Sequence, residues 1–279
     1  MSQAYLNGQY LPVEECRIPA LDRGFIFGDA IYELIPVYSA QPFQLQAHLT
    51  RLQRSLAQVR ISNPHSEYDW QQIISQLIAN ANLDQCSIYT QAPRGGAARD
   101  HPSPPAATPT VFAMVNPWPK QDEMMLSQGL SAVTVEDMRW NRCDIKVTSL
   151  LANVMMKQHA IDAQAHEAIF IRDNAVLEGS STNVFVVSKE HVYTAPKNNL
   201  VLPGITRDVV VDLVHACNMP MHEEAVRMED LINADEIWLT SSTKECLPVT
   251  QLNQQPVGNA QPGKLWHTVY TAFQALKSP

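Results

Sequence analysis

Hydrophobic and polar positions along the chain predict a mixture of amphipathic helices and short strands. Leu45, Leu49, Leu52 and Leu56 recur at helical spacing and predict an amphipathic helix over residues 44–59. Shorter apolar runs between turn residues predict a hairpin and a series of strands. The hairpin covers residues 4–13, and the strands cover 31–38, 86–92, 108–115, 129–135, 168–171, 175–177, 184–187, 191–194 and 236–239. Further helices are expected over 68–81, from about 202 to 217 and over 263–275, so the predicted fold class is α+β.

A linker is expected over residues 116–123, because this segment is polar and contains two prolines between predicted strands. The linker predicts two domains. Residues 1–118 form a small N-terminal α/β domain, and residues 119–279 form a larger, strand-rich C-terminal domain with helices packed outside.

Composition narrows the class of protein. Of the 279 residues, 45% are hydrophobic and 17% are charged, which is typical of a globular protein. The net charge of -8, without a Lys/Arg cluster, argues against a nucleic-acid partner. No uninterrupted apolar stretch is long enough to span a membrane, and the start shows no basic region followed by an apolar run. The five cysteines are far apart and form no Cys-x-x-Cys pair, so we expect a reduced, cytoplasmic protein.

Several common catalytic motifs are absent from the sequence. It contains no Walker loop, no Gly-x-Gly-x-x-Gly, no His-Glu-x-x-His and no Gly-x-Ser-x-Gly. His222, Glu223 and Glu224 are adjacent, and adjacent residues do not converge on one ion from a strand or a helix. We therefore predict no metal site.

Lys146 is the most informative single residue. It lies between Ile145 and Val147, at the end of a short extended segment, and a helical apolar pattern is expected to follow at once, with Thr148 or Ser149 as its cap. The apolar positions of that pattern are Leu150, Leu151, Val154, Met155 and Ala160. Partial burial at such a junction would favour the uncharged amine, which is the form that makes imines. A surface lysine with its ammonium in water explains this stretch equally well.

Other residues match the needs of an aldehyde cofactor that carries a phosphate. Such a cofactor requires an amine, an acid against its ring nitrogen and a cradle for the anion. Glu178, at the end of a predicted strand, is a candidate acid, although a turn cap is the more ordinary role. Ile205 and Thr206 open a helix whose N–H groups face an anion, and the hydroxyls of Ser242 and Thr243 follow a strand. Arg51 offers a fixed positive charge. Taken singly, each of these features is more often structural.

A flexible, proline-rich loop over residues 94–102 is a second candidate for chemistry. Arg99 and His101 are two residues apart, so in an extended segment their side chains lie on the same side. An arginine beside an imidazole suits a carboxylate, and Tyr32 could add a hydroxyl. The alternative is a solvated basic loop.

These segments together resemble the fold-type IV pyridoxal-phosphate aminotransferases, and most closely the D-amino-acid aminotransferases. The resemblance covers nearly the whole chain, in six blocks that stand in the family's order. The blocks are Asp22-Arg23-Gly24 with Phe27-Gly28-Asp29 and Tyr32-Glu33; His48-x-x-Arg51-Leu52; Asp144-Ile145-Lys146 with Leu150-Leu151-x-Asn153; Glu178-Gly-Ser-Ser-Thr-Asn; Leu202-Pro-Gly-Ile-Thr-Arg; and Ser242-Thr243-x-Glu245-x-x-Pro248-Val249.

The resemblance implies a two-domain fold with a barrel-like C-terminal domain and pyridoxal 5'-phosphate as cofactor. It implies that Lys146 holds the cofactor and is catalytic. It assigns Arg51, Glu178, Leu202, Ile205, Thr206, Ser242 and Thr243 to the cofactor, and Tyr32, Arg99 and His101 to the substrate. Arg99 and His101 would reach over from the neighbouring subunit, which implies a homodimer. The implied reaction is transfer of an amino group from D-amino acids, such as D-alanine, to 2-oxo acids, such as 2-oxoglutarate, with ping-pong kinetics.

Alternatives remain open at this point. The same fold would suit a branched-chain L-amino-acid aminotransferase, an aminodeoxychorismate lyase or an (R)-amine transaminase. A non-catalytic protein that binds the cofactor and a purely structural domain are the others. Pro93, Ala30 and the pair Val147-Thr148 depart from the family's usual residues and leave the side-chain preference undecided.

Overall fold

The computed structural model describes residues 3–105, 107–118 and 123–277, which form two compact units. The first contains residues 1–119 together with 145–150, and the second contains 120–144 together with 151–279. Residues 119–122 of the predicted linker lie outside the described residues. The short segment around Lys146 therefore belongs to the first unit, although the predicted division places it in the C-terminal domain.

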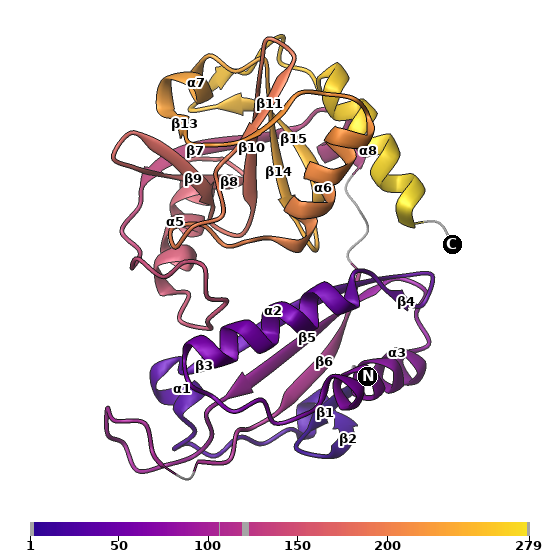
Figure 1. The fold of residues 1–279 in the computed structure, drawn as a ribbon, viewed down its shortest axis with the longest axis vertical. Coiled ribbons are helices and arrows are strands. Elements are labelled where there is room, and N and C mark those ends of the chain that lie inside the picture. The colour runs from indigo at the N-terminus through magenta and orange to yellow at the C-terminus, as the bar shows by residue number, and fades with distance from the viewer. Residues whose placement is uncertain (1–2, 106, 119–122, 278–279) are drawn as a thin grey trace. The chain divides into compact units, whose positions relative to one another are not determined.

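The first unit is built on an antiparallel sheet in the order β2-β1-β6-β5-β3-β4 (Figure 1). Helices α2 and α3 share one hydrophobic core with this sheet, in which Leu52, Trp70 and Ile35 are buried. The leucine pattern of α2 and the capping box of Ser66 and Asp69 at α3 account for these two helices. The elements are β1 (Gln3–Leu6), β2 (Gln9–Pro12), η1 (Val13–Glu15), α1 (Arg23–Phe27), β3 (Ala30–Tyr38), β4 (Gln41–Pro42), α2 (Leu45–Gln58), α3 (Glu67–Ala81), β5 (Cys86–Pro93) and β6 (Phe112–Pro117).

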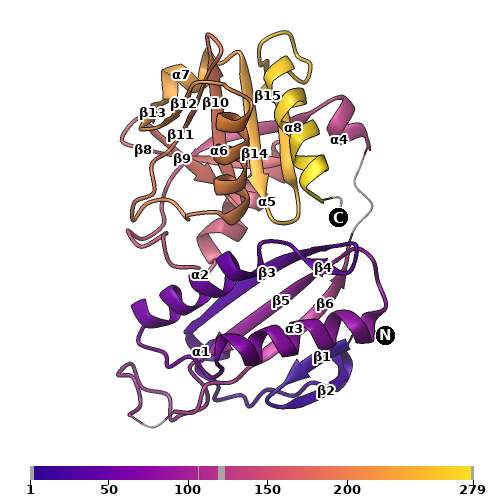
Figure 2. The same cartoon turned by 45° about the vertical axis from the view of Figure 1, so that its right-hand side comes forward.

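The second unit is a closed sheet with helices outside it. Strands β10, β14, β15, β7, β8 and β9 pair in succession, and the pairing of β9 with β10 closes the ring into a barrel. Helices α6 and α8 lie side by side against it (Figure 2). The elements are α4 (Glu123–Ser127), β7 (Leu130–Glu136), α5 (Leu151–Asp162), β8 (Glu167–Arg172), β9 (Ala175–Gly179), β10 (Asn183–Ser188), β11 (His191–Thr194), α6 (Ile205–Ala216), β12 (Met221–Glu223), β13 (Val226–Arg227), α7 (Met228–Ile232), β14 (Glu236–Ser241), β15 (Glu245–Leu252), β16 (Gln255–Pro256) and α8 (Lys264–Lys277).

Most observed boundaries lie within three residues of the predicted ones, but two elements begin about four residues later than predicted. The strand expected from residue 108 begins only at Phe112, because Pro109 has no N–H to donate and the Val111 N–H donates to the side chain of Asn7 at 2.8 Å. The helix expected directly after Lys146 begins at Leu151. Thr148 and Ser149 are not at its cap position, because the residue before the helix is Leu150. Both hydroxyls donate to the carbonyl of Gly28 at 3.0 Å. Gly28 has a φ of 65°, a conformation that suits a glycine at the end of α1.

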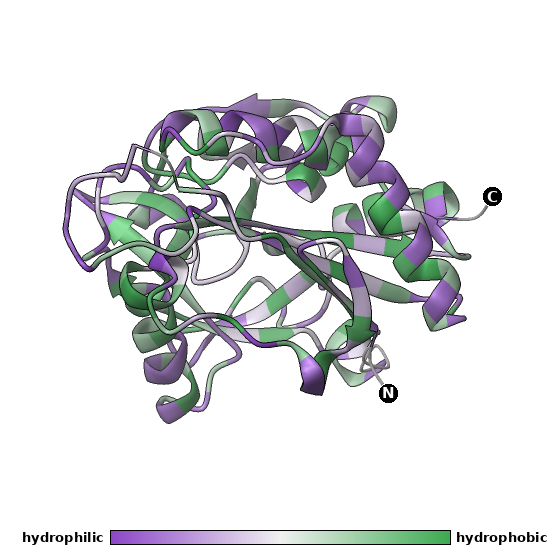
Figure 3. Cartoon of the chain, turned by 90° about the horizontal axis from the view of Figure 1, so that it is seen from below, coloured by the Kyte–Doolittle hydropathy of each residue, from purple (hydrophilic) through white to green (hydrophobic). Residues whose placement is uncertain are grey.

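Helix α5 carries an apolar face that its own unit does not cover. Leu151, Val154 and Met155 are 73%, 61% and 49% exposed, and Ala160 is the buried residue of the helix. In α2 and α3, by contrast, apolar residues are buried in the core of the first unit. Figure 3 shows hydrophobic and hydrophilic residues interspersed along the helices. None of the described helices combines the length and apolar character needed to cross a bilayer.

A buried ionic cluster fastens α2 to β3. Glu33 points from β3 to α2 and accepts hydrogen bonds from Nε and Nη2 of Arg51, both at 2.7 Å, and from His48 at 2.8 Å. Burial alone would raise the pKa of the Glu33 carboxyl, but the charge and hydrogen bonds of Arg51 outweigh burial and hold the pKa well below its usual value. Burial lowers the pKa of His48. The charge and hydrogen bonds of Arg51 thus offset most of the cost of burying the Glu33 carboxylate.

Glu33→Gln should lower the free energy of unfolding by about 3–5 kcal/mol at pH 7, since it leaves a buried guanidinium without its carboxylate. The pKa of Glu33 is lower in the folded chain than in the unfolded chain, where it is about 4.3. Its contribution is therefore complete above about pH 5 and is lost as the pH falls. Denaturant unfolding measures this contribution. The difference in the free energy of unfolding between variant and parent should be about 1 kcal/mol smaller at pH 3.5 than at pH 7.

The exposed Glu14→Gln is the matched control for this measurement and should change stability at neither pH. A difference between Glu33→Gln and the parent that grows in acid contradicts the role given to the cluster.

Candidate active site

The predicted site residues are divided between the two units. The first unit holds Tyr32, Arg51, Arg99, His101 and Lys146. The second holds Glu178, Leu202, Ile205, Thr206, Ser242 and Thr243. Each set has its own internal geometry.

Lys146 is half-buried and lies against β3. Val147 bridges Ile31, and the Tyr32 N–H donates to the Lys146 carbonyl at 3.1 Å, so the backbone around the lysine is fixed on both sides. Its Nζ lies 4.1 Å from the centroid of the Tyr32 ring. Within the described residues no hydrogen bond or ion pair occupies Nζ. The structure therefore presents a primary amine held by an aromatic face and by backbone, without a carboxylate partner.

Arg51 is held in place by the buried Glu33. Its bidentate contact with both carboxylate oxygens orients the guanidinium plane, and only 6% of the residue is exposed. A charge fixed in this way loses little side-chain entropy when an anion binds.

Arg99 and His101 lie together on Phe27. The Arg99 guanidinium is 5.5 Å from the centroid of the Phe27 ring, and the His101 ring is 5.8 Å from it. Both side chains are thus on one side of their loop. Among the residues that the structure describes, no hydrogen bond or ring contact joins Tyr32 to Arg99 or His101. The three residues predicted for the substrate carboxylate are therefore separate groups within one chain.

In the second unit, Glu178 is buried and meets three donors. Arg139 donates to Oε1 at 2.5 Å, and the Leu202 N–H donates to Oε2 at 2.9 Å. The Asn183 amide donates to Oε2 at 3.5 Å, and it also donates to the Leu202 carbonyl at 2.9 Å. Burial raises the pKa of the Glu178 carboxyl, while Arg139 and the Leu202 amide oppose that shift by stabilising the carboxylate. The carboxyl is thus held in one orientation at the end of β9.

The start of α6 offers backbone donors. Gly204 is the residue before the helix, and no side chain of the described residues caps the N–H groups of Ile205, Thr206 and the next residue. A Cβ at position 204 would lie 2.0 Å from Oδ1 of Asn183, so glycine allows this close approach. Thr206 is 5% exposed. An uncapped helix start with an adjacent hydroxyl has the chemistry of an anion site.

Ser242 and Thr243 lie in the turn between β14 and β15, and a buried carboxylate holds the next residue. Lys244 Nζ donates at 3.0 Å to Glu167, which is fully buried. Glu167 also accepts from the hydroxyls of Ser180 and Ser181, which follow Glu178. Burial would raise the pKa of Glu167, but Lys244 and Lys157 lower it below its usual value. Glu167 thereby links the turn after Glu178 to the turn that contains Ser242 and Thr243.

Sequence reasoning missed Arg139 and Glu167. Arg139 is 39 residues from Glu178, and Glu167 is 77 residues from Lys244. No local spacing predicts such pairs, because only the closed sheet brings these distant segments of the chain together. A single acidic residue at the start of an otherwise apolar strand, as at Glu167, is the signal that the sequence offers.

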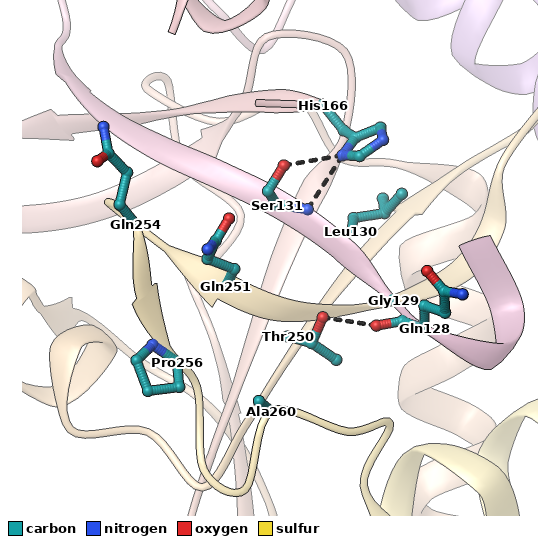
Figure 4. Close-up of a pocket in the computed structure, with 10 residues that line it drawn as sticks. All are labelled: Gln128, Gly129, Leu130, Ser131, His166, Thr250, Gln251, Gln254, Pro256 and Ala260. Carbon is teal, nitrogen blue, oxygen red and sulfur yellow. Dashed lines mark hydrogen bonds between the residues drawn. The ribbon is translucent and has the colours of Figure 1, made fainter. Parts of the chain in front are cut away.

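A separate hollow of about 380 Å³ lies in the second unit, around Gln128–Ser131, His166 and Thr250 (Figure 4). None of the predicted site residues lines it. Ser131 donates to Nδ1 of His166 from both its hydroxyl, at 2.9 Å, and its N–H, at 3.1 Å. The described residues that line the hollow are chiefly polar and uncharged, among them Gln128, Gln251 and Gln254. The hollow therefore does not compete with the residues described above.

Two comparisons with curated relatives cover nearly the whole chain. The D-alanine aminotransferase of Bacillus licheniformis is 41% identical over 268 residues, which are 96% of this chain and 94% of the relative. The D-alanine aminotransferase of Staphylococcus aureus strain COL is 35% identical over 275 residues, 98% of this chain and 97% of the relative.

Solved structures share the fold. The branched-chain amino acid aminotransferase of Escherichia coli superposes with a TM-score of 0.92 over 98% of this chain and 94% of that chain, at 23% identity. A fold IV transaminase from Curtobacterium pusillum covers all of both chains with a TM-score of 0.87, at 20% identity. At such identities the likeness concerns the fold alone, and it confirms the predicted fold-type IV architecture.

The family model that describes class IV amino-transferases matches residues 30–252, a span that runs from β3 to the end of β15. The match includes Arg51, Lys146, Glu178 and the two turns before α6 and β15. This span and the full-length relatives show that the chain belongs to the class IV aminotransferases.

Proposed function

We propose that this protein transfers the amino group of D-amino acids, such as D-alanine, to 2-oxo acids, such as 2-oxoglutarate, with pyridoxal 5'-phosphate as cofactor. The observation that carries the proposal is 41% identity to a D-alanine aminotransferase over 96% of the chain. The likeness to branched-chain aminotransferases, at 23% identity, is weaker evidence about the substrate.

The residues present fit this cofactor. The donor set comprises a primary amine without a carboxylate partner among the described residues (Lys146), a buried carboxylate (Glu178), a fixed guanidinium (Arg51) and an uncapped helix start at Ile205 and Thr206. Ser242, Thr243 and the backbone of Leu202 complete the set that would hold the phosphate and the ring. When bound, the cofactor supplies an electron sink for the carbanion formed at the substrate's Cα.

The protein's own residues move the proton and fix the charges. Lys146 Nζ takes the proton from Cα of the amino donor and returns a proton as the acceptor is aminated. Glu178 would place a negative charge against the ring nitrogen, and Arg139 keeps that carboxyl in its orientation. Arg51 and the α6 N–H groups would neutralise the phosphate. Because the donor leaves as a 2-oxo acid before the acceptor binds, the kinetics are ping-pong.

Stereochemistry follows from where the substrate carboxylate is held. Arg99, His101 and Tyr32 would bind it on one side, so that only one enantiomer turns its α-hydrogen towards Lys146. Arg99 and His101 share one aromatic support, whereas Tyr32 supports Lys146. The separation of these groups within one chain supports a site that a second copy completes.

We propose accordingly that the enzyme is a homodimer with shared active sites. The exposed apolar face of α5 supports this assembly, because Leu151, Val154 and Met155 face water in the single chain. The five free cysteines support a reduced, cytoplasmic location.

We also propose that the chain has two domains, with the division between residues 118 and 119.

The direct test of the function is a panel of D- and L-amino acids with 2-oxoglutarate or pyruvate as acceptor. D-alanine with 2-oxoglutarate should yield pyruvate, and L-alanine and L-leucine should react about 100-fold more slowly or worse, as expected for a misplaced α-hydrogen. Lys146→Ala should abolish this transfer, with a loss in kcat of at least 10²–10⁴. It should also remove the visible absorption band of the purified enzyme.

Lys146→Arg keeps the charge but not the primary amine, so it should behave like Lys146→Ala. Lys189→Ala changes an exposed lysine and should keep both rate and spectrum. An unchanged spectrum in Lys146→Ala refutes the assignment of the lysine, and a preference for L-leucine refutes that of the substrate.

Arg99→Ala should raise KM for D-amino acids by roughly 10–150-fold, which corresponds to the 1.5–3 kcal/mol of a hydrogen bond to a charged group. Steady-state kinetics with D-alanine and with a primary amine that lacks a carboxylate measure this. The amine should show no added loss. Arg17→Ala, an exposed arginine elsewhere, serves as control. Equal responses of the amine and D-alanine contradict the carboxylate role.

Val154→Glu should shift the assembly from dimer to monomer, because it places a charge in the middle of the apolar face of α5. Light scattering coupled to size-exclusion chromatography measures the mass. Tyr68→Glu makes the same change at an exposed aromatic residue of α3 and should keep the parent's mass. A parent that is a monomer at all concentrations removes the dimer from the proposal.

A further inference from the structure

Arg23 is an arginine that the proposed chemistry does not use, and it is almost fully buried. It is the first residue of α1 and is 5% exposed. Its Nε donates to Asp29 at 2.8 Å. A buried guanidinium has five donors that need acceptors, so the contacts of the other end of Arg23 indicate what it holds.

The far end of Arg23 binds the backbone of the substrate loop. Nη1 donates to the carbonyl of Asp100 at 2.6 Å and reaches that of Pro102 at 3.5 Å, and Nη2 donates to the carbonyl of His101 at 3.2 Å. These three consecutive residues follow Arg99. One charged group from the start of the chain thus fixes the backbone that carries both predicted carboxylate ligands.

Phe27, one helical turn beyond Arg23, supports the side chains of the same loop. Its ring centroid is 4.8 Å from the Arg23 guanidinium and 5.5 Å from that of Arg99. The His101 ring lies 5.8 Å away at an angle of 32°. Residues four apart face the same side of a helix, so α1 presents Arg23 to the loop backbone and Phe27 to its side chains.

The loop needs such support, because it has little of its own. Arg99, Asp100 and His101 are exposed and belong to no helix or strand. A surface loop without regular hydrogen bonds samples many backbone conformations. An arginine and an imidazole recognise a carboxylate only when their separation and direction are held. The contacts of Arg23 and Phe27 restrict both the separation and the direction of the Arg99 and His101 side chains.

Asp29 provides a comparison within the same cluster. It accepts from Arg23 and also from Arg94, which donates at 2.7 and 2.9 Å. Burial would raise the pKa of Asp29, but these two arginines lower it. The other donors of Arg94 bind the carbonyls of Val59 and Arg60 instead of the loop. Arg23 and Arg94 therefore share a carboxylate and differ in the segment that they hold.

We propose that Arg23 and Phe27 are positioning residues that set the conformation of residues 99–102 and thereby the recognition of the substrate carboxylate by Arg99 and His101. The inference rests on the proposed function and adds to it the two residues on which its carboxylate specificity depends. Neither residue touches the reacting atoms.

The test compares Arg23→Lys with Arg94→Lys in the holoenzyme. Lysine keeps the charge, but its single ammonium cannot bind Asp29 and three carbonyls together. Arg23→Lys should raise KM for D-alanine about 10-fold, in line with the loss of charged hydrogen bonds, with kcat and the absorption spectrum nearly unchanged. The rate with a primary amine that lacks a carboxylate should stay at the parent's value. Arg94→Lys should keep the parent's KM.

Hydrogen exchange gives a readout that does not depend on activity. The amides of residues 99–103 should exchange about 10-fold faster in Arg23→Lys than in the parent and in Arg94→Lys, because the bonds to this segment are lost. Phe27→Leu retains an apolar side chain and should raise KM by about 2–5-fold, the range of an exposed cation–π contact. It keeps the proposal testable if Arg23→Lys does not fold.

Four results overturn the proposal. Equal effects of Arg23→Lys and Arg94→Lys on KM would assign the effect to Asp29. Equal effects on D-alanine and on the amine would assign it to general damage. If Arg99→Ala raises KM but Arg23→Lys and Phe27→Leu do not, only the present inference fails. If Arg99→Ala leaves KM unchanged, the carboxylate role in the proposed function fails with it.

Discussion

Burying a carboxylate is costly unless a cation and hydrogen bonds compensate it, and much of this structure is arranged around that constraint. Glu33, Glu178 and Glu167 are each at most 5% exposed. Their compensating cations come from other elements: Arg51 on α2, Arg139 after β7 and Lys244 in the turn before β15. Each pair ties two segments together at a defined angle. The ionic pairs thus determine geometry more than they add stability.

The same constraint links scaffold and site. Arg51 is oriented by Glu33, Glu178 by Arg139, and the turn with Ser242 and Thr243 is held through Lys244 and Glu167. In the first unit Asp29 and Arg23 extend the principle to a loop without regular structure. A residue proposed to touch cofactor or substrate is therefore generally one contact away from a buried ion pair. These buried ion pairs restrict the rotamers of the proposed site residues, and a catalytic site requires such fixed side chains.

Two features of the single chain acquire meaning only in the proposed assembly. The apolar stripe of α5 faces water, although hydrophobic residues at helical spacing ordinarily face a core. Arg99 and His101 both contact the ring of Phe27, whereas the ring of Tyr32 contacts Lys146. The first feature supports an interface, and the second supports a site built from two copies.

The sequence by itself predicted the fold class, most of the helices and strands, and the candidate residues of the active site. Helical leucine spacing placed α2, the helix expected over residues 68–81 corresponds to α3, and the order of six blocks placed Lys146, Glu178 and Arg51 within one family. These features are local, because periodicity and caps depend on neighbours along the chain. Only the tertiary structure decided which charged side chains contact and orient these residues. Arg139, Glu167 and Arg23 act on residues 39 to 79 positions away, and no local pattern encodes such distances. It also decided that α5 begins at Leu151 and not directly after Lys146, because residues 145–150 pack in the first unit, where the Thr148 and Ser149 hydroxyls donate to Gly28.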